Sequence, residues 1–406
     1  MAHRRRIFAC SSVAIDYFDF LTKSLAASAD EVVAVTAVSE GGYRRAARGS
    51  RLVRLVLRLR MYVVYPLLLA GAALRARRGD TFVVTSNTFF APAWVALLVR
   101  WRGIRVVHVL YDLYPDAIEV AGRITTGGMA ARIIGWVTRL NQRWAAGTVY
   151  LGDFLRDYAE RRWGQTRKPV VIPIATDVRL YGGEPPNPPT LPPLRLHYGG
   201  QLGLMHDADS LLAGLRALAA SGALGTSVTF DALISGGRAA EFEAALRNTP
   251  GVYIAGTLPS DSWRRHAEGQ HVGVVTLSPG GATVCLPSKT YAMMAAGLAI
   301  VAVCPWWSDL ARLVEETGAG WVVNNAASPP PLQQPAYVGA CRATRPLGEV
   351  AAEFCDRIRR LAESPAEVQA CRENAWRAVR ERFSPELISR EWSAYLATLA
   401  EGDRQA

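Results

Sequence analysis

A lysine in a loop between two apolar runs is the residue of this sequence with the clearest chemical potential. The segment 286–297 reads Leu-Pro-Ser-Lys-Thr-Tyr-Ala-Met-Met-Ala-Ala-Gly and lies between the apolar runs 272–277 and 299–303. This order predicts a strand, a loop, a short helix and a second strand. Ser288 and Lys289 would lie where the first strand ends and the helix begins. Free helix N–H groups and a lysine charge both favour an anion there, so the segment predicts a phosphate or diphosphate site.

Three other segments place glycine, acidic or aromatic residues at the ends of apolar runs. They are 198–203, Tyr-Gly-Gly-Gln-Leu-Gly, with His-Asp at 206–207; 109–116, Val-Leu-Tyr-Asp-Leu-Tyr-Pro-Asp; and 171–177, Val-Ile-Pro-Ile-Ala-Thr-Asp. Together with the lysine loop, and taken in their order along the chain, these segments resemble segments of family 4 glycosyltransferases. The resemblance is to the branch with a Pro-Ser-Lys-x-Tyr donor loop, of the bacterial surface-polysaccharide type.

The resemblance implies a fold and an activity. The fold would be α/β of the GT-B type, with two doubly wound parallel-sheet (Rossmann-like) domains facing a cleft. The activity would be transfer of a sugar from a nucleotide-sugar donor on the second domain to a saccharide acceptor on the first. The family implies retention of configuration at the anomeric carbon. The nucleotide sugar is then a substrate, and we expect no cofactor.

The resemblance also implies donor-binding residues, and here the sequence departs from the family. Many relatives carry an Arg and a Lys after the first strand of the second domain. Gln201 and His206 occupy those positions, in a loop with Gly200 and Gly203. We expect His206 to act on the departing diphosphate, with full charge if that dianion raises its pKa. Tyr291, the tyrosine of the lysine loop, completes the implied donor site.

Two glutamates that the better-known branch of the family uses near the donor are absent. Val284 and Ala292 stand at their positions. Contact with the ribose is therefore expected from other residues, and Ser308, Asp309 and Glu316 are the candidates best placed in the sequence. Each of the three is equally compatible with an ordinary helix position.

The first domain offers a candidate acceptor site. Asp112 ends an apolar run, so it would lie at the edge of the cleft and could orient an acceptor hydroxyl or accept its proton. Alternatively, it could bond the turn before Pro115. Relatives often have a histidine before this aspartate, whereas here Tyr111 precedes it. Asn87 follows another apolar run and is also predicted to contact the acceptor.

Positive charge is concentrated in the first domain. Residues 1–180 carry 27 Lys and Arg against 13 Asp and Glu, a net charge of +14, whereas the rest has 19 against 22, a net charge of −3. The segment 44–78 has ten arginines and no acidic residue around the apolar stretch 61–70. It predicts either an interface with anionic lipid or a solvated helix packed on the sheet. The lipid interpretation assigns membrane contact to Arg51, Arg54, Arg58 and Arg60.

The apolar part of this segment is shorter than the roughly 20 residues of a spanning helix. No nucleic-acid motif accompanies the basic residues, so nucleic acid is not an expected partner. We therefore expect a cytoplasmic protein, peripheral on the inner face of the cytoplasmic membrane, acting on a saccharide or lipid-linked saccharide.

Apolar runs alternate with helical stretches in both halves, which is typical of parallel sheets covered on both faces. The runs are 7–11, 31–38, 81–86, 105–112, 147–151 and 169–175, then 195–200, 227–235, 252–256, 272–278, 299–304 and 320–323. A proline-rich linker at 181–193 would join an N-terminal domain, 1–180, to a C-terminal domain, 194–383. Residues 384–406 predict a last helix, which in the family returns to the first domain.

The six cysteines are scattered, which predicts neither a disulfide framework nor a zinc cluster and fits a reduced cytoplasm. No metal site is expected, because His266 and His271 would lie on different faces of a helix. Two other functions stay open. One is a sugar-nucleotide epimerase of the same fold, and the other is a catalytically degraded GT-B protein that acts as a binding or scaffold partner.

Overall fold

The computed structural model describes residues 5–14, 16–47, 49–174, 176–184, 190–328 and 339–402. The chain divides into two compact units. We call Met1–Ala175 with Pro385–Ala406 the N-terminal unit, and Thr176–Ser384 the C-terminal unit. Two proline-rich stretches lie outside the described residues. One is the part of the predicted linker at 185–189, and the other, at 329–335, predicts a surface loop.

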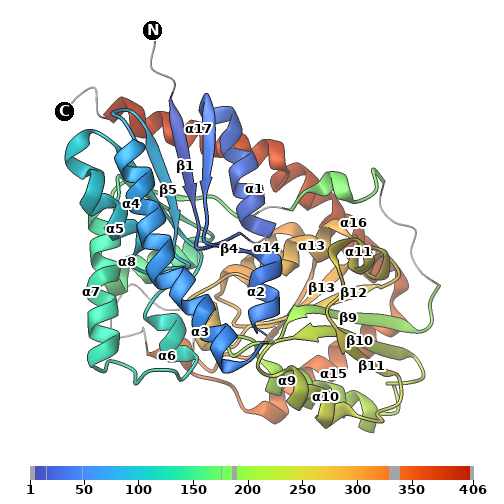
Figure 1. Ribbon diagram of the computed structural model, residues 1–406. Coiled ribbons are helices and arrows are strands. Elements are labelled where there is room, and N and C mark those ends of the chain that lie inside the picture. The colour runs from blue at the N-terminus through green and yellow to red at the C-terminus, as the bar shows by residue number, and fades with distance from the viewer. Residues whose placement is uncertain are drawn as a thin grey trace. The chain divides into compact units, whose positions relative to one another are not determined.

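A parallel six-stranded sheet, in the order β3-β1-β5-β6-β7-β8, forms the centre of the N-terminal unit (Figure 1). Its strands are β1 (Arg6–Cys10), β3 (Glu31–Val35), β5 (Thr81–Thr85), β6 (Arg105–Leu110), β7 (Gly147–Tyr150) and β8 (Pro169–Val171). Each strand lies in a predicted apolar run. A two-stranded parallel pair, β2 (Val13–Ala14) and β4 (Val38–Ser39), was not predicted.

Helices cover both faces of this sheet, which explains why its central strands are apolar on both sides. On one face, α4 (Tyr65–Arg75) and α5 (Ala91–Val99) pack on Phe8, Phe82 and Val106, and α7 (Met129–Trp144) packs beside α5. On the other face lie α1 (Asp16–Leu25) and α17 (Pro385–Gly402), which a hydrogen bond from Ser389 Oγ to the Ser24 carbonyl joins at 2.8 Å. The unit also contains α6 (Asp116–Val120), α8 (Asp153–Trp163), η1 (Ala26–Ser28) and η3 (Arg100–Arg102).

The basic segment forms helices, and they differ in burial. After α2 (Glu40–Ala47), one continuous helical stretch consists of α3 (Arg51–Leu59), a π-helical turn η2 (Arg60–Val64) and α4. The α4 helix buries five side chains in the core, including Tyr65 and Leu69, whereas α3 and η2 bury none. The predicted packing of the basic segment on the sheet is therefore confirmed for α4 and wrong for α3.

The C-terminal unit has a second parallel six-stranded sheet, in the order β11-β10-β9-β12-β13-β14. Its strands are β9 (Leu194–Gln201), β10 (Val228–Ser235), β11 (Val252–Gly256), β12 (Val272–Thr276), β13 (Ala299–Cys304) and β14 (Gly320–Asn324). These strands also coincide with predicted runs. Two parallel sheets in two Rossmann-like units confirm the predicted α/β class.

Helices on the second sheet bury its core on one face and position its loops on the other. On the core face, Phe354 of α15 (Leu347–Glu363) passes so close to Gly214 of α9 (Ala208–Ala220) that a Cβ there would lie 2.5 Å from its ring. The remaining helices are α10 (Ala239–Leu246), α11 (Ser260–Glu268), α12 (Pro279–Ala282), α13 (Lys289–Ala295), α14 (Asp309–Thr317), α16 (Pro365–Arg382), η4 (Val178–Leu180) and η6 (Ala340–Arg342).

The strand order reverses once in each sheet. In the C-terminal unit the reversal lies between β9 and β12, and in the N-terminal unit it lies between β1 and β5. Ligands of open α/β sheets bind outside the carboxyl ends of the strands at such points. A functional site is therefore expected in the loops that follow these four strands, or in the loop that follows the neighbouring strand β6.

Candidate functional site

Lys289 lies at the strand reversal of the C-terminal unit. Its ammonium nitrogen donates a hydrogen bond to the Gln201 carbonyl at 3.2 Å and lies 3.8 Å from the ring centroid of Tyr198. Both partners belong to β9, so the predicted lysine loop and the predicted glycine loop come together. Burial lowers the pKa of Lys289 well below its ordinary value. A carbonyl and an aromatic face solvate the cation only in part, so an anion would be a stronger partner.

The glycine loop brings His206 into the same cluster. Gly200 has a φ of +94°, a conformation that glycine adopts at little cost. The Gly203 N–H donates to Nδ1 of His206 at 3.1 Å, which leaves Nε2 as the ring nitrogen that carries the proton. Burial, with the nearby Lys289, lowers the pKa of His206 well below its ordinary value. Neutral His206 can donate one hydrogen bond, through Nε2–H.

Residues that the sequence did not point to hold this loop in place. The Met205 carbonyl accepts from the Ser278 N–H at 2.9 Å, and a Cβ at Gly281 would come within 2.2 Å of that carbonyl. The buried amide of Asn325 donates to Asp207 at 2.7 Å and to the Leu277 carbonyl at 2.8 Å. These contacts join residues 48 to 118 positions apart, so no local pattern could have revealed them.

Three further predicted donor residues, Ser288, Tyr291 and Ser308, differ in burial. Ser288 is exposed beside Lys289, and its side chain makes no capping hydrogen bond. Tyr291 is buried, with its ring 5.1 Å from that of Phe383, and its part in donor binding stays a prediction. Ser308 is also buried and caps α14 by accepting from the Ala311 N–H at 3.1 Å, which explains its position without a ligand.

Glu316 does not lie with these loops. It is in the last turn of α14, seven residues after Asp309, which is about 10 Å along a helix. Its carboxylate pairs with Arg312 at 3.7 Å and with Arg382 of α16 at 3.3 Å. The helix carries Glu316 away from the carboxyl ends of the strands, and its contact with the ribose stays a prediction. Asp309, at the first position of α14, remains near that edge.

Two histidines and an aspartate form a partly buried cluster next to the glycine loop. Nδ1 of His197 lies 2.6 Å from Asp231, and His266 forms a short hydrogen bond to the other oxygen of the same carboxylate. Such a group could hold a metal ion. However, the Trp263 indole N–H donates to Nε2 of His197 at 3.0 Å, which requires the proton of this imidazole to be on Nδ1. Nδ1 then donates to Asp231, so the cluster is a hydrogen-bond network in this state.

In the N-terminal unit, Asp112 follows β6. The hydroxyl of Ser86, at the end of β5, accepts from the backbone N–H groups of both Tyr111 and Asp112 at 3.0 Å. No described residue donates a hydrogen bond to the Asp112 carboxylate. Burial raises its pKa to about 6. A carboxyl with this pKa can accept a proton near neutrality.

Polar groups with spare bonding capacity follow other strands of the same sheet. The Asn87 amide donates to the Tyr17 hydroxyl at 2.6 Å, while its own oxygen, buried, has no partner among the described residues. Ser12, after β1, likewise has a buried hydroxyl without a partner in the described part of the chain. Tyr43 and Tyr114 are close enough to Asp112 for its charge to raise the pKa of their hydroxyls, after burial. Such a group of hydroxyls, an amide and a carboxyl can bind a polyhydroxylated ligand.

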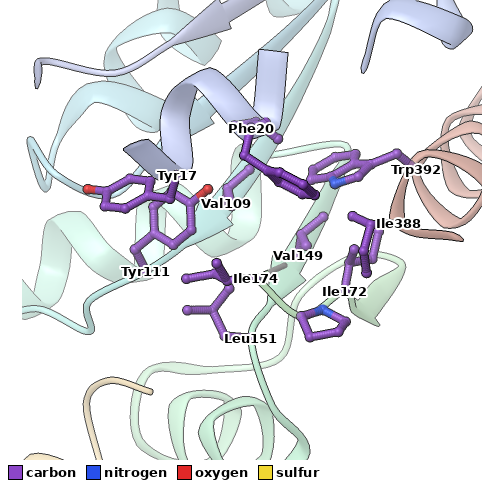
Figure 2. Close-up of a pocket in the computed structure, with 12 residues that line it drawn as sticks. Tyr17, Phe20, Val109, Tyr111, Val149, Leu151, Ile172, Ile174, Ile388 and Trp392 are labelled. Carbon is purple, nitrogen blue, oxygen red and sulfur yellow. The ribbon is translucent and has the colours of Figure 1, made fainter. Parts of the chain in front are cut away.

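An apolar pocket opens beside this polar group (Figure 2). It has about 300 Å³ of empty space, counting the part open to solvent, and its walls come from α1, β6, β7 and α17. Tyr17 and Tyr111 lie at one side, with ring centroids 4.5 Å apart, and Trp392 lies at the other. Tyr111 therefore lines a pocket, next to the residue that sequence reasoning predicted to act on the acceptor.

The α3 helix presents its charges and its apolar side chains on different sides. Arg51, Arg54 and Arg58 are exposed at spacings of three and four residues, which places them on one stripe. Leu52, Leu55 and Leu59 lie on another stripe with exposed fractions of 69%, 52% and 50%. Arg60 is also exposed. None of the described helices is both long and apolar enough to span a bilayer.

Comparisons with known proteins give relatives of distant sequence. No protein-family model matches the chain. It is 23% identical over 257 residues to a probable glycosyltransferase, WbjE, of Pseudomonas aeruginosa. This match covers 61% of the chain and 63% of the length of that curated relative, which is less than two thirds.

Solved structures resemble the chain over nearly its whole length. HepE of Anabaena, in complex with UDP, matches with a TM-score of 0.65 and 14% identity, covering 98% of this chain and 100% of that one. Sucrose-phosphate synthase of Thermosynechococcus elongatus gives 0.66 and 15%, with the same coverage. Trehalose 6-phosphate synthase of Burkholderia multivorans gives 0.61 and 14%, covering 99% and 98%. The likeness to these GT-B glycosyltransferases confirms the predicted fold.

Proposed function

We propose that this protein is a glycosyltransferase that takes a sugar from a nucleotide-sugar donor, with UDP as the first nucleotide to test. The observation that carries the proposal is the cluster of Lys289, His206 and the glycine loop at the strand reversal of the C-terminal unit. The relation to a probable glycosyltransferase and the fold shared with a UDP-bound structure support it. The family 4 resemblance supports retention at the anomeric carbon.

The proposed donor site neutralises the diphosphate with protein groups and without a metal ion. Lys289 exchanges the Gln201 carbonyl for a phosphate oxygen, which is a stronger, charge-assisted partner. His206 donates through Nε2–H and stabilises the charge that develops on the departing diphosphate. An anion bound there raises the pKa of both groups, so each becomes more cationic on binding.

The proposed acceptor site is the polar group around Asp112. A carboxyl whose pKa lies near 6 is ionised at neutral pH and free of protein donors among the described residues, so it can accept a hydrogen bond from an acceptor hydroxyl. Asn87, after the neighbouring strand β5, and Tyr17, in the first turn of α1, supply further hydrogen-bonding groups. Asp112 thus orients the hydroxyl and takes up its proton.

We further propose that the acceptor is a lipid-linked saccharide of bacterial polysaccharide or glycolipid synthesis. The support is α3, whose exposed leucines and arginines suit the surface of an anionic bilayer. The protein would then act on the inner face of the cytoplasmic membrane. Each arginine near such a surface contributes about 1 kcal/mol, and salt screens this attraction.

Donor hydrolysis tests the activity. Purified protein is incubated with UDP-, GDP- and dTDP-sugars, and release of nucleoside diphosphate is measured with and without a chelator. Release with one donor, unaffected by the chelator, supports a metal-independent transferase. Calorimetric binding of UDP without release from any donor, even with saccharide acceptors present, would instead favour the scaffold. Conversion of a donor to its sugar epimer would favour the epimerase.

Liposome sedimentation tests the membrane assignment. Wild-type protein should sediment with anionic vesicles at low salt and leave them at high salt. Replacing Arg51, Arg54, Arg58 and Arg60 together by Gln should abolish sedimentation. The matched change of four exposed arginines of the C-terminal unit should not; these are Arg216, Arg247, Arg359 and Arg360. Wild-type protein that ignores anionic vesicles at low salt would remove the main support for a lipid-linked acceptor.

A further inference from the structure

A row of aromatic rings leads from the neighbourhood of Asp112 to the exposed helix. Tyr114, two residues after Asp112, lies 6.1 Å from Phe89 between ring centroids. Phe89 lies 5.3 Å from Phe90, and Phe90 lies 6.3 Å from Tyr62 of η2. We call these four residues the aromatic row. It connects a candidate catalytic group to a helix that buries none of its own side chains.

The aromatic row is not part of the hydrophobic core. Tyr62 has an exposed fraction of 41%, and the other three rings are half-buried. Burial of an apolar ring stabilises a fold, so rings kept partly in water gain more when a ligand covers them. Phe89 and Phe90 carry no hydrogen-bonding group in their side chains. Their surface therefore suits hydrocarbon better than the hydroxyls of a sugar.

The backbone next to the aromatic row departs from a regular α-helix, and side-chain hydrogen bonds hold it in that conformation. The Tyr65 N–H donates to the Arg60 carbonyl, five residues back, which is the π-helical pattern. Pro66 has no N–H, so the Met61 carbonyl lacks the corresponding partner. The Thr88 hydroxyl donates to that carbonyl instead, at 3.3 Å. A second bond, from the Trp94 indole to the Pro66 carbonyl at 3.1 Å, fixes the same turn.

These bonds tie the turn carrying Tyr62 to the loop carrying Phe89 and Phe90. The same loop holds Asn87, whose amide bonds Tyr17 beside Asp112. Burial raises the pKa of the Tyr62 hydroxyl and the nearby Arg58 opposes this, which places a cation at the outer end of the row. The row thus has a carboxyl at its inner end, and a cation with exposed leucines at its outer end.

We infer that the aromatic row binds the hydrocarbon chain of an amphiphilic acceptor, an isoprenyl or acyl glycolipid. The acceptor's sugar lies at Asp112, its chain lies on Phe89 and Phe90, and its distal end reaches the bilayer at α3. This inference rests on the proposed function, because it assigns the acceptor of the same site. Continuity of the row with the amphipathic helix, and the cation at its outer end, favour this occupant over a soluble glycan.

Paired acceptors test the inference in wild-type protein and in Phe90→Ala. One acceptor is a long-chain glycoside and the other is the methyl glycoside of the same sugar. We expect kcat/KM for the long-chain acceptor to fall about tenfold or more in the variant, with the methyl glycoside unchanged. Phe154→Ala on α8, another half-buried ring, is the control and should change neither. Equal losses for both acceptors would make the row a sugar platform, and no loss would remove it from the acceptor site.

A binding measurement separates this inference from the proposed activity. Octyl glucoside below its micelle concentration should bind the wild type, while methyl glucoside at the same concentration binds much more weakly. Phe90→Ala should lose the difference, and Tyr62→Ala should reduce it. This result would support the row even if no nucleotide sugar is turned over. Octyl and methyl glucosides that bind alike in the wild type would overturn it, whatever the activity.

Discussion

The two units place opposite chemistry at the carboxyl edge of similar sheets. The N-terminal unit has a carboxyl, Asp112, whose pKa burial raises to about 6, whereas the C-terminal unit has an ammonium, Lys289, whose pKa burial lowers. Each shift favours the neutral form, because burial removes solvent from the charge. In each unit a ligand can replace that solvent. An acceptor hydroxyl suits the carboxyl, and a diphosphate suits the ammonium.

The two groups differ in how the protein satisfies them. Lys289 already has a carbonyl and an aromatic face as partners, so a ligand must displace one interaction to gain another. The Asp112 carboxylate has no hydrogen-bond donor among the described residues, and partnerless polar atoms of Asn87 and Ser12 lie at neighbouring strand ends. The N-terminal unit therefore leaves its acidic group without a donor. The C-terminal unit gives Lys289 partners, although the buried hydroxyls of Thr276 and Thr290 have none among the described residues.

The largest effect is expected when the carboxylate of Asp112, the proposed general base, is removed. Asp112→Asn keeps the shape of the side chain and should lower turnover by about 10² to 10⁴, the usual contribution of a positioned acid or base. Affinity for UDP should not change. The wild-type rate should fall as the pH drops through about 6, because Asp112 becomes protonated there, and this limb should be absent in the variant.

Asp19→Asn is a matched control, because that carboxylate is exposed and pairs with Lys23 on the surface. It should keep both the wild-type rate and the pH profile. A full wild-type rate at pH values well below 6, or an Asn variant with normal turnover, would remove Asp112 from the chemistry.

The second largest effect is expected on the affinity for UDP, when the ammonium group of Lys289 is removed. Lys289→Ala should weaken UDP binding by about 1.5–3 kcal/mol, or roughly 10- to 150-fold, which is the usual cost of losing a charge-assisted hydrogen bond. Titration calorimetry measures it directly. Lys23→Ala, which removes an exposed lysine of the N-terminal unit, should have no effect. Unchanged affinity in a folded Lys289→Ala protein would contradict the donor site.

Sequence reasoning was most successful where side-chain type alone decides the structure. Twelve apolar runs predicted the twelve strands of the two sheets, because strands buried on both faces must be apolar throughout. The lysine loop and the glycine loop were also assigned to one site, and Lys289 does contact the carbonyl of Gln201. Both are short patterns next to strands, which makes them visible in a sequence.

Sequence reasoning is least informative where burial or long-range contacts decide a residue's role. Tyr291 and Ser308 have side chains that could bind a nucleotide, but one packs on Phe383 and the other caps a helix. Asn325 was missed because its partners, Asp207 and Leu277, are far away in the sequence. Phe89 and Phe90 follow the predicted run 81–86 and were not singled out, because only the positions of Tyr62 and Tyr114 reveal the aromatic row.

A smaller effect concerns stability and should oppose the effect on activity. The pKa of Asp112 is raised in the folded protein, so its ionised form destabilises the fold at pH values above about 6. Below pH about 4 the carboxyl is protonated in both folded and unfolded states, and the cost disappears. Asp112→Asn should therefore be more stable than the wild type by about 1–2 kcal/mol near pH 7.5. Urea unfolding at both pH values measures this, and a variant less stable than the wild type at pH 7.5 would contradict a buried, unpaired charge.

The smallest effect is the uptake of a fraction of a proton when UDP binds. It distinguishes the carboxyl edges of the two sheets most directly. Burial lowers the pKa of Lys289 in the free protein, and a bound diphosphate should raise it, so UDP binding should take up protons. Affinity for UDP should then fall with rising pH, starting at lower pH than an ordinary lysine would allow. Calorimetry in two buffers of different ionisation enthalpy gives the number of protons, expected to be below one for this group. The uptake should vanish in Lys289→Met and persist in Asp112→Asn, because only the C-terminal unit holds the cation. Equal uptake in wild type and Lys289→Met would mean that another group, such as His206, carries the linkage.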